Sequence, residues 1–181
     1  LSESLETLGA KLLFNFGNVV DKLSQIHQEY DIASLYSHEE TGLTWSWERD
    51  KSVTRWCKEN EVTFTEYATN GVIRGLQSRD HWKSQRDARV DGELISTPVA
   101  IQSPENLKSD TIPEAKELGM TPRVLEYRPI AGEKAAISVL FSFLDERGRT
   151  YRSGMSSPIT GREACSRLSP YISTGCITIR Q

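Results

Sequence analysis

Strand-like and helix-like segments alternate through the first 90 residues, and this alternation limits the fold more than any other feature of the chain. Short apolar or β-branched segments at 11–16, 31–36 and 61–67 predict three strands. Helical patterns separate them, and Asn18 is placed to cap the first of these helices. Strands joined through helices of this length pair in parallel. Residues 1–90 are therefore predicted to form an α/β domain, a partial Rossmann-like parallel sheet.

A proline-rich stretch follows a last helical pattern, which runs from about Val72 to Val90. Residues 91–130 show no apolar periodicity and predict a long connector over the protein surface. They contain five of the seven prolines: Pro98, Pro104, Pro113, Pro122 and Pro129. A loop of this length is unusual inside one compact domain, so we expect it to join two domains.

Helical patterns dominate the remaining residues, 131–181. Apolar side chains recur at helical spacing between Gly132 and Arg147 and predict an amphipathic helix. A shorter helical stretch is predicted from Gly161 to near Gly175. This part therefore reads as the opening of an all-helical domain.

Composition excludes several classes of protein. The formal net charge is −3 and the isoelectric point is about 5.7, whereas a free-standing nucleic-acid-binding unit usually carries a strong basic excess. The three cysteines form no CxxC pair and the three histidines are scattered, so we predict reduced thiols, a cytoplasmic location and no metal site. No membrane-spanning run or signal peptide is present. The chain begins with Leu1, and we expect it to be an internal piece of a longer protein.

The segment Cys165–Ser169 has the chemistry of an anion site. Predicted to lie at a helix start, it offers backbone N–H groups, two serine hydroxyls and the guanidinium of Arg167. Taken alone, the same residues favour another interpretation, in which Ser166 caps a helix and Arg167 lies in solvent, because serines at helix starts are mostly caps.

Several stretches, in order along the chain, resemble the DNA photolyase/cryptochrome family of flavoproteins. The segment 35–57 is similar to the middle of that family's N-terminal antenna domain, and 70–82 is similar to the part that follows. The helix opening Gly132-Glu133-Lys134-Ala135-Ala136 resembles the start of the flavin domain. Met155-Ser156-Ser157-Pro158 and Cys165 to Gly175, which includes Ser-Arg-Leu-Ser-Pro-Tyr, match its flavin-phosphate segment.

The resemblance implies a cofactor site for flavin adenine dinucleotide (FAD). Its residues here are Tyr151, Cys165, Ser166, Arg167, Leu168 and Ser169. Where Cys165 stands, the family usually has threonine or a small residue, so one hydrogen-bond donor is weakened. The family's opening strand and the rest of its flavin domain are absent. The chain therefore contains no catalytic residue, and we expect it to be inactive by itself.

The implied function is that of a deoxyribodipyrimidine photolyase, a lyase that binds ultraviolet-damaged DNA and splits pyrimidine dimers under blue light. Two alternatives stay open: a cryptochrome photoreceptor without repair activity, and a non-catalytic α/β scaffold. An antenna chromophore, folate or deazaflavin, is left unassigned, although the loop Ser37–Glu40 follows a predicted strand. By the resemblance, Arg147, Arg149 and Arg152 lie closer than the other basic residues to the region where the family approaches DNA, although they form only a weak signal. The oligomeric state is left open.

Overall fold

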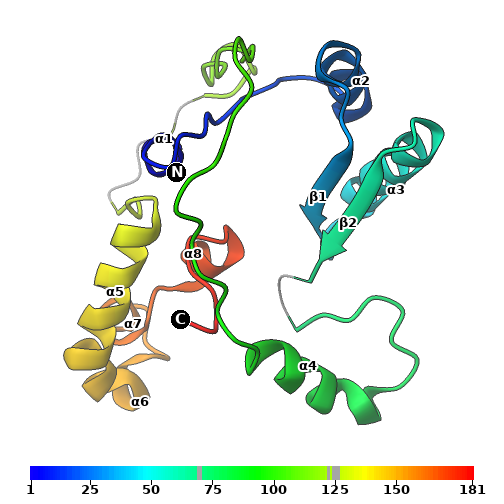
Figure 1. Ribbon diagram of the computed structural model, residues 1–181. Helices are drawn as coiled ribbons and strands as arrows, with labels where there is room; N and C mark the ends of the chain where they lie inside the picture. Colours follow the sequence, from blue (N-terminus) through cyan, green and yellow to red (C-terminus); the bar gives the residue numbers. More distant parts are fainter. Residues whose placement is uncertain (69–70, 122, 124–126) are drawn as a thin grey trace.

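The computed structural model describes residues 1–68, 71–121, 123 and 127–181. Its elements follow the predicted change from mixed α/β to helical structure (Figure 1). In chain order they are α1 (Ser2–Glu6), α2 (Val19–Tyr30), β1 (Ser34–His38), α3 (Thr44–Glu59), β2 (Thr63–Tyr67), the 3₁₀ turn η1 (Arg79–His81), α4 (Trp82–Val90), α5 (Glu133–Asp145), the 3₁₀ turn η2 (Arg147–Thr150), α6 (Tyr151–Gly154), α7 (Gly161–Ala164) and α8 (Ser169–Ser173).

Strands β1 and β2 pair in parallel, as the βαβ pattern predicts, with Ser34 opposite Thr63 and His38 opposite Tyr67. Helix α3 makes the crossover between them. Asn18 caps α2 as predicted, because its side chain accepts hydrogen bonds from the backbone N–H groups of Val20 and Asp21. Among the described residues the sheet has these two strands and no others, so the observed fold is mixed α/β with a small parallel sheet.

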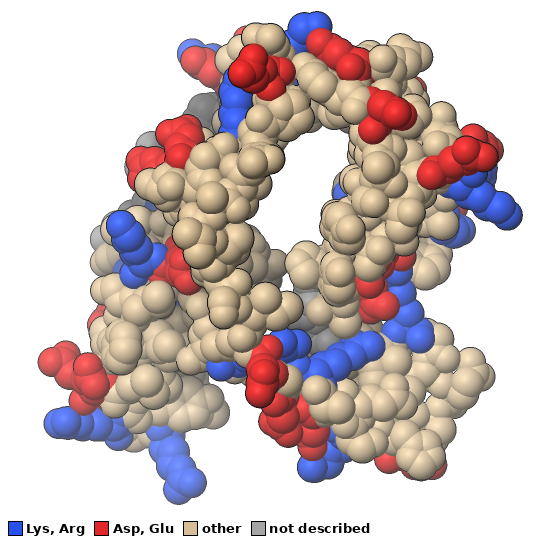
Figure 2. Space-filling model, in the orientation of Figure 1, with Lys and Arg blue, Asp and Glu red and all other residues tan. Residues whose placement is uncertain are grey.

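Apolar packing gathers in two separate clusters. The first joins α2, α3 and β2 around Val53, Trp56, Cys57 and Val62. The second joins α5 to α8 around Ala136, Tyr171 and Ile177. The accessible surface is 14579 Å², against about 8,800 Å² for a compact monomer of this mass. The clusters therefore stand apart, and the space-filling view shows an opening between parts of the chain (Figure 2).

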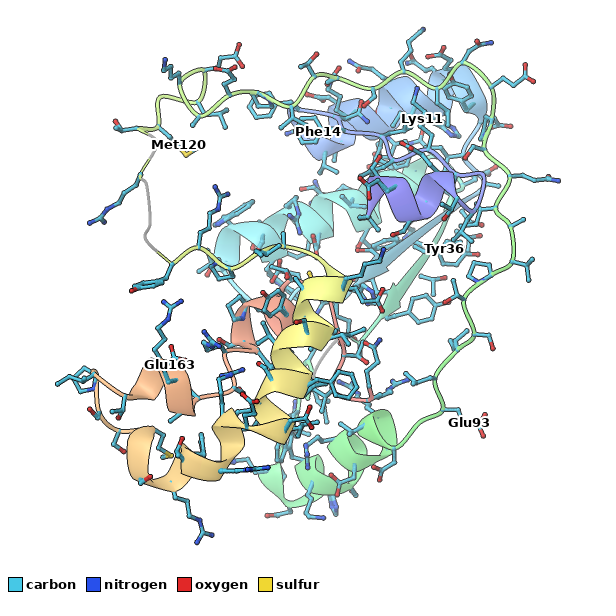
Figure 3. All side chains as sticks on the ribbon, turned by 90° about the vertical axis from the view of Figure 1, so that its left-hand side faces the viewer. Lys11, Phe14, Tyr36, Glu93, Met120 and Glu163 are labelled. Carbon is cyan, nitrogen blue, oxygen red and sulfur yellow. The ribbon has the colours of Figure 1, made fainter. Side chains whose placement is uncertain are left out.

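The predicted strand at 11–16 is wrong. The backbone N–H groups of Lys11, Phe14 and Phe16 donate to side chains of the connector rather than to a neighbouring strand. The acceptors are Ser103 Oγ at 3.2 Å, Ser109 Oγ at 2.9 Å and Asp110 Oδ2 at 2.9 Å. Because side chains of the connector accept these hydrogen bonds, residues 11–16 do not form the backbone hydrogen bonds of a β-sheet. The segment is therefore held by the connector without pairing as a strand. Lys11 and Phe14 are seen beside the connector in Figure 3.

The predicted helix from Val72 is also wrong over its first ten residues, since α4 begins at Trp82. The carbonyls of Gly71 and Val72 accept hydrogen bonds from side chains of α4, Trp82 Nε1 at 2.7 Å and Arg89 Nη1 at 2.7 Å. These contacts fold the segment back onto α4 instead of continuing the helix.

The connector is held to the first part of the chain by ion pairs. Lys22 Nζ lies 3.0 Å from Asp110 Oδ2, and Lys108 Nζ lies 2.8 Å from Glu29 Oε1. The hydroxyl of Tyr30 donates to the carbonyl of Asn106 at 2.9 Å. The connector therefore lies along α2 and the segment before it. The domain boundaries at residues 90 and 130 stay a prediction.

Acid is expected to loosen this contact. The N–H of Phe16, followed by Lys22, lowers the pKa of Asp110 below its usual value of about 3.9. Because the pKa of Asp110 is lower in the folded chain than in the unfolded chain, the contact is stabilised at pH values above the unfolded-state pKa. This stabilisation is lost as the pH falls through the folded-state pKa. The Phe16 amide resonance should therefore shift below about pH 4. In Asp110→Asn this shift should vanish; a shift that persists would contradict the contact.

Candidate functional site

The segment predicted to bind an anion is a turn between two short helices. Helix α7 ends at Ala164, and α8 begins at Ser169. The prediction of one continuous helix from Gly161 to Gly175 is therefore wrong, because residues 165–168 are not helical. The N-cap of α8 is Leu168 and no side chain caps it, so the structure does not support the interpretation of Ser166 as a helix cap.

Backbone geometry in the turn exposes a row of N–H groups. Arg167 has a φ of 60°, and Leu168 returns to the right-handed helical region at φ −88°, ψ −16°. Alternation between the two hands turns successive N–H groups toward one side, the arrangement of anion-binding backbone nests. Within the described residues, no acceptor meets the N–H groups of Ser166, Arg167 or Leu168. The turn therefore offers unused donors.

Arg167 carries a further unused donor. Its Nε is buried and has no hydrogen-bond partner among the described residues. A buried guanidinium N–H without an acceptor costs free energy, which an anionic oxygen would offset. The positive charge of Arg167 also lies near Arg147 and adds to the effect of burial in lowering the pKa of Arg147 from its usual value. An anion beside Arg167 would relieve this repulsion as well.

Of the other predicted site residues, Tyr151 lies on α6, whereas Cys165, Leu168 and Ser169 belong to the turn. Tyr151, at the start of α6, is 42% exposed, and its ring meets that of Phe143 edge to face at 6.0 Å between centroids. Cys165 is half-buried, with Sγ 4.0 Å from the carbonyl of Met155. Leu168 packs against the second apolar cluster, and Ser169 is exposed. The structure therefore brings residues 165–169 into one turn, while no hydrogen bond or ring contact joins Tyr151 to it among the described residues.

Arg147 is the residue that sequence reasoning misplaced. Its guanidinium does not reach outward as a DNA contact would. It donates to the carbonyls of Val139, Cys165 and Ser166 and to the hydroxyl of Ser142. It also lies 5.7 Å from the ring centroid of Phe143. Arg147 therefore joins α5 to the turn. The sequence feature that could have indicated this role is the position of Arg147 directly after the predicted amphipathic helix.

Helix α8 is attached to α5 through Tyr171. This residue is 5% exposed, and its hydroxyl donates to the carbonyl of Ile130 at 2.9 Å. We expect Tyr171→Phe to lower the free energy of unfolding of the C-terminal cluster by about 1 kcal/mol, because one buried hydrogen bond is lost and the ring is kept. Chemical denaturation followed by methyl NMR of Ile177 would measure it. The same change at the more exposed Tyr151 is the control, and an equal loss in both variants would contradict this prediction.

A second charged cluster lies at the carboxyl ends of β1 and β2. Arg74 donates to Glu66 Oε1 at 3.0 Å and to the carbonyl of Glu40 at 2.9 Å. Its guanidinium lies over the ring of Trp47, 4.7 Å from the centroid. Arg74 Nη2 and Glu39 Oε2 are buried without a hydrogen-bond partner in the described residues. The antenna chromophore stays unassigned.

The basic residues of α4 also pair locally. Lys83 Nζ and Arg86 Nη1 each lie 2.7 Å from an oxygen of Asp87. This supports a self-paired, solvated face rather than a contact with nucleic acid. Among the described residues no cluster of three or more metal-ligating side chains is found. No described helix is long and apolar enough to cross a membrane.

Comparison with known proteins rests on structure alone, because no protein-family model and no curated protein sequence matches the chain. A bacterial class III photolyase from Agrobacterium tumefaciens is similar over 99% of this chain, with a TM-score of 0.74 and 17% sequence identity. An archaeal photolyase from Sulfolobus tokodaii, solved with two FAD molecules, is similar over 99% of it, with a TM-score of 0.60 and 18% identity. The chain spans 40% and 39% of those two structures. It therefore has the fold of part of a photolyase.

Proposed function

We propose that the chain is part of a photolyase/cryptochrome flavoprotein, and that the turn Cys165–Ser169 binds the phosphates of FAD. The observation that carries this proposal is the turn itself, where backbone N–H groups and the Nε of Arg167 have no acceptor within the part of the chain that the structure describes. The shared fold supports it, as does the FAD bound by the archaeal photolyase. Helix α8 has five residues, so we assign the phosphates to the turn rather than to a helix dipole.

The residues fit a pyrophosphate group. Backbone N–H groups of 166–168, the hydroxyls of Ser166 and Ser169, and the guanidinium of Arg167 are all donors, as phosphate oxygens require. The thiol of Cys165 is a weak donor and adds little. Tyr151, with its ring partly exposed at the start of α6, is proposed to contact the cofactor from the segment that precedes the turn.

We propose photolyase activity for a protein that contains this chain together with the remaining part of the fold. When bound, reduced FAD supplies the electron that splits a pyrimidine dimer under blue light. The protein positions the cofactor and excludes water, and the dimer is captured by flipping it out of the duplex. Because the chain spans about 40% of the solved photolyases, we expect these 181 residues to retain little FAD by themselves.

The flavin content of the longer protein tests the cofactor proposal. Purified under mild conditions, it should absorb as a flavoprotein, and Arg167→Gln should lower its affinity for FAD about ten- to a hundredfold, since one charge-assisted hydrogen bond is worth about 1.5–3 kcal/mol. Arg152→Gln, a change of equal charge at an exposed position on α6, is the control. A colourless protein that takes up no FAD would exclude the flavoprotein assignment and favour a non-catalytic scaffold.

A repair assay separates the two light-dependent functions. An oligonucleotide that carries a pyrimidine dimer is illuminated with blue light in the presence of the reduced longer protein. Loss of the dimer is expected. FAD binding without any loss of the dimer would reject repair and leave the cryptochrome function.

A further inference from the structure

The half-buried Arg147 contacts the turn Cys165–Ser169 from the side of α5. Its guanidinium donates to the carbonyls of Cys165 and Ser166, in the second case at 3.2 Å. The same group is anchored on α5 through Val139 O at 2.9 Å and Ser142 Oγ at 3.0 and 3.1 Å. One side chain thus ties two consecutive peptide units of the turn to a helix eighteen or more residues earlier in the chain.

Holding a carbonyl also fixes the N–H of the same peptide unit. A trans peptide is planar, and its C=O and N–H point in opposite directions; the described residues contain no cis peptide. Because the carbonyls of Cys165 and Ser166 point toward Arg147, the N–H groups of Ser166 and Arg167 point away from it. These N–H groups belong to the row without acceptors.

The backbone of Arg167 needs this support. A φ of 60° places a residue other than glycine in the left-handed region, which costs of order 1 kcal/mol or more. Bonds from a charged guanidinium to the preceding carbonyls offset that cost. Lysine cannot reproduce them, because an ammonium group is a single point donor and the guanidinium is a planar fork with five N–H donors.

We propose that Arg147 is the positioning residue of the phosphate-binding turn: it holds the carbonyls of Cys165 and Ser166 so that the N–H groups of Ser166 and Arg167 face the anion. This inference rests on the proposed function for the identity of the anion. The conformational part does not, since it concerns the backbone of Arg167 without any ligand. Burial and the nearby charge of Arg167 lower the pKa of Arg147, which is consistent with a guanidinium enclosed by its carbonyl partners.

The test uses the 181-residue chain, NMR of its backbone amides and inorganic pyrophosphate as the probe. The strength of the intraresidue HN–Hα cross-peak of Arg167 reports whether φ is positive. Shifts of the Ser166, Arg167 and Leu168 amides report pyrophosphate binding. Arg147→Lys keeps the charge and removes the fork; Arg149→Lys, at an exposed position two residues away, is the matched control.

We expect Arg147→Lys to lose the positive φ of Arg167 and to weaken pyrophosphate binding about tenfold, or about 1.4 kcal/mol, whereas Arg149→Lys changes neither. Unchanged φ in Arg147→Lys would overturn the inference, whether or not the affinity falls, because the turn would then keep its backbone conformation without the guanidinium. If pyrophosphate fails to shift these amides in the wild type while φ still depends on Arg147, the positioning role stands and the phosphate assignment fails.

A milder variant covers the case in which Arg147→Lys unfolds the C-terminal cluster, seen as loss of the native Ile177 methyl resonance. Ser142→Ala removes the acceptor of Arg147 Nε and one acceptor of Nη2, and leaves the guanidinium in place. It should weaken the same cross-peak and reduce the pyrophosphate affinity in the same direction by a smaller factor. A wild-type signal for Arg167 in this folded variant would overturn the role of the Ser142–Arg147 anchor.

Discussion

Replacing Trp56 by alanine is expected to cost the N-terminal cluster about 3–5 kcal/mol, enough to unfold α2 and α3 at room temperature. Trp56 is 5% exposed and packs against Val53, Cys57 and Val62. Its Nε1 donates to Ser24 Oγ at 2.8 Å, and its ring meets His27 edge to face at 5.6 Å. Alanine would leave a cavity and would remove the hydrogen bond that Ser24 Oγ accepts, although this hydroxyl still donates to the carbonyl of Val20 at 2.9 Å.

Urea titration followed by circular dichroism and methyl NMR would measure this loss. The control is Trp45→Ala, on the same helix, because Trp45 is 64% exposed and its loss should change stability by less than about 0.5 kcal/mol. The Ile177 methyl in the second cluster should keep its wild-type transition in both variants. A loss that affects both clusters equally would contradict their independence.

The first cluster and the elements around it follow from local patterns in the sequence. Trp56 follows Val53 at helical spacing, and both are buried on the inner face of α3. Asn18 precedes an apolar stripe and caps α2. The parallel pairing of β1 and β2 follows from the crossover through α3. Each of these features depends on residues close in sequence or on a general rule of connection.

Features that depend on distant partners could not be predicted. Residues 11–16 have the composition of a strand, but their N–H partners lie in the connector more than 90 residues later. The helical pattern before Trp82 is overridden by side chains of α4 that bind backbone carbonyls. The turn at 165–168 interrupts a helical pattern because Arg147 binds two of its carbonyls. The residue types at 165–169 were enough to predict the donors of the candidate site. The conformation of the turn that presents these donors depends on Arg147, which is distant in the sequence.

The second large loss of stability is expected at the contact between α6 and α7, where Gly154 packs closely against Ala164. Gly154 is buried, and a Cβ atom built on it would lie 2.7 Å from the Cβ of Ala164. Both atoms are attached directly to backbone, so neither can rotate away. Gly154→Ala should therefore force α7 outward and lower the free energy of unfolding of the C-terminal cluster by about 1–3 kcal/mol.

A second substitution identifies this clash as the cause. Ala164→Gly alone should cost about 1 kcal/mol, from helix propensity and lost burial. Combined with Gly154→Ala it removes the atom in conflict, so the double variant should be more stable than the sum of the single losses by about 1 kcal/mol or more. Gly92→Ala is the control, because its Cβ would meet atoms no closer than 3.6 Å. Additive losses would show that α6 and α7 do not lie this close.

The same pair tests how α7 supports the candidate site. Cys165 follows Ala164 directly, and its carbonyl accepts a hydrogen bond from Arg147. If α7 moves outward in Gly154→Ala, this carbonyl leaves the guanidinium, and the positive φ of Arg167 should be lost along with stability. Adding Ala164→Gly should let α7 pack against α6 again, and the positive φ of Arg167 should then return. Recovery of stability without recovery of the Arg167 backbone would separate the packing of α6 and α7 from the geometry of the phosphate-binding turn.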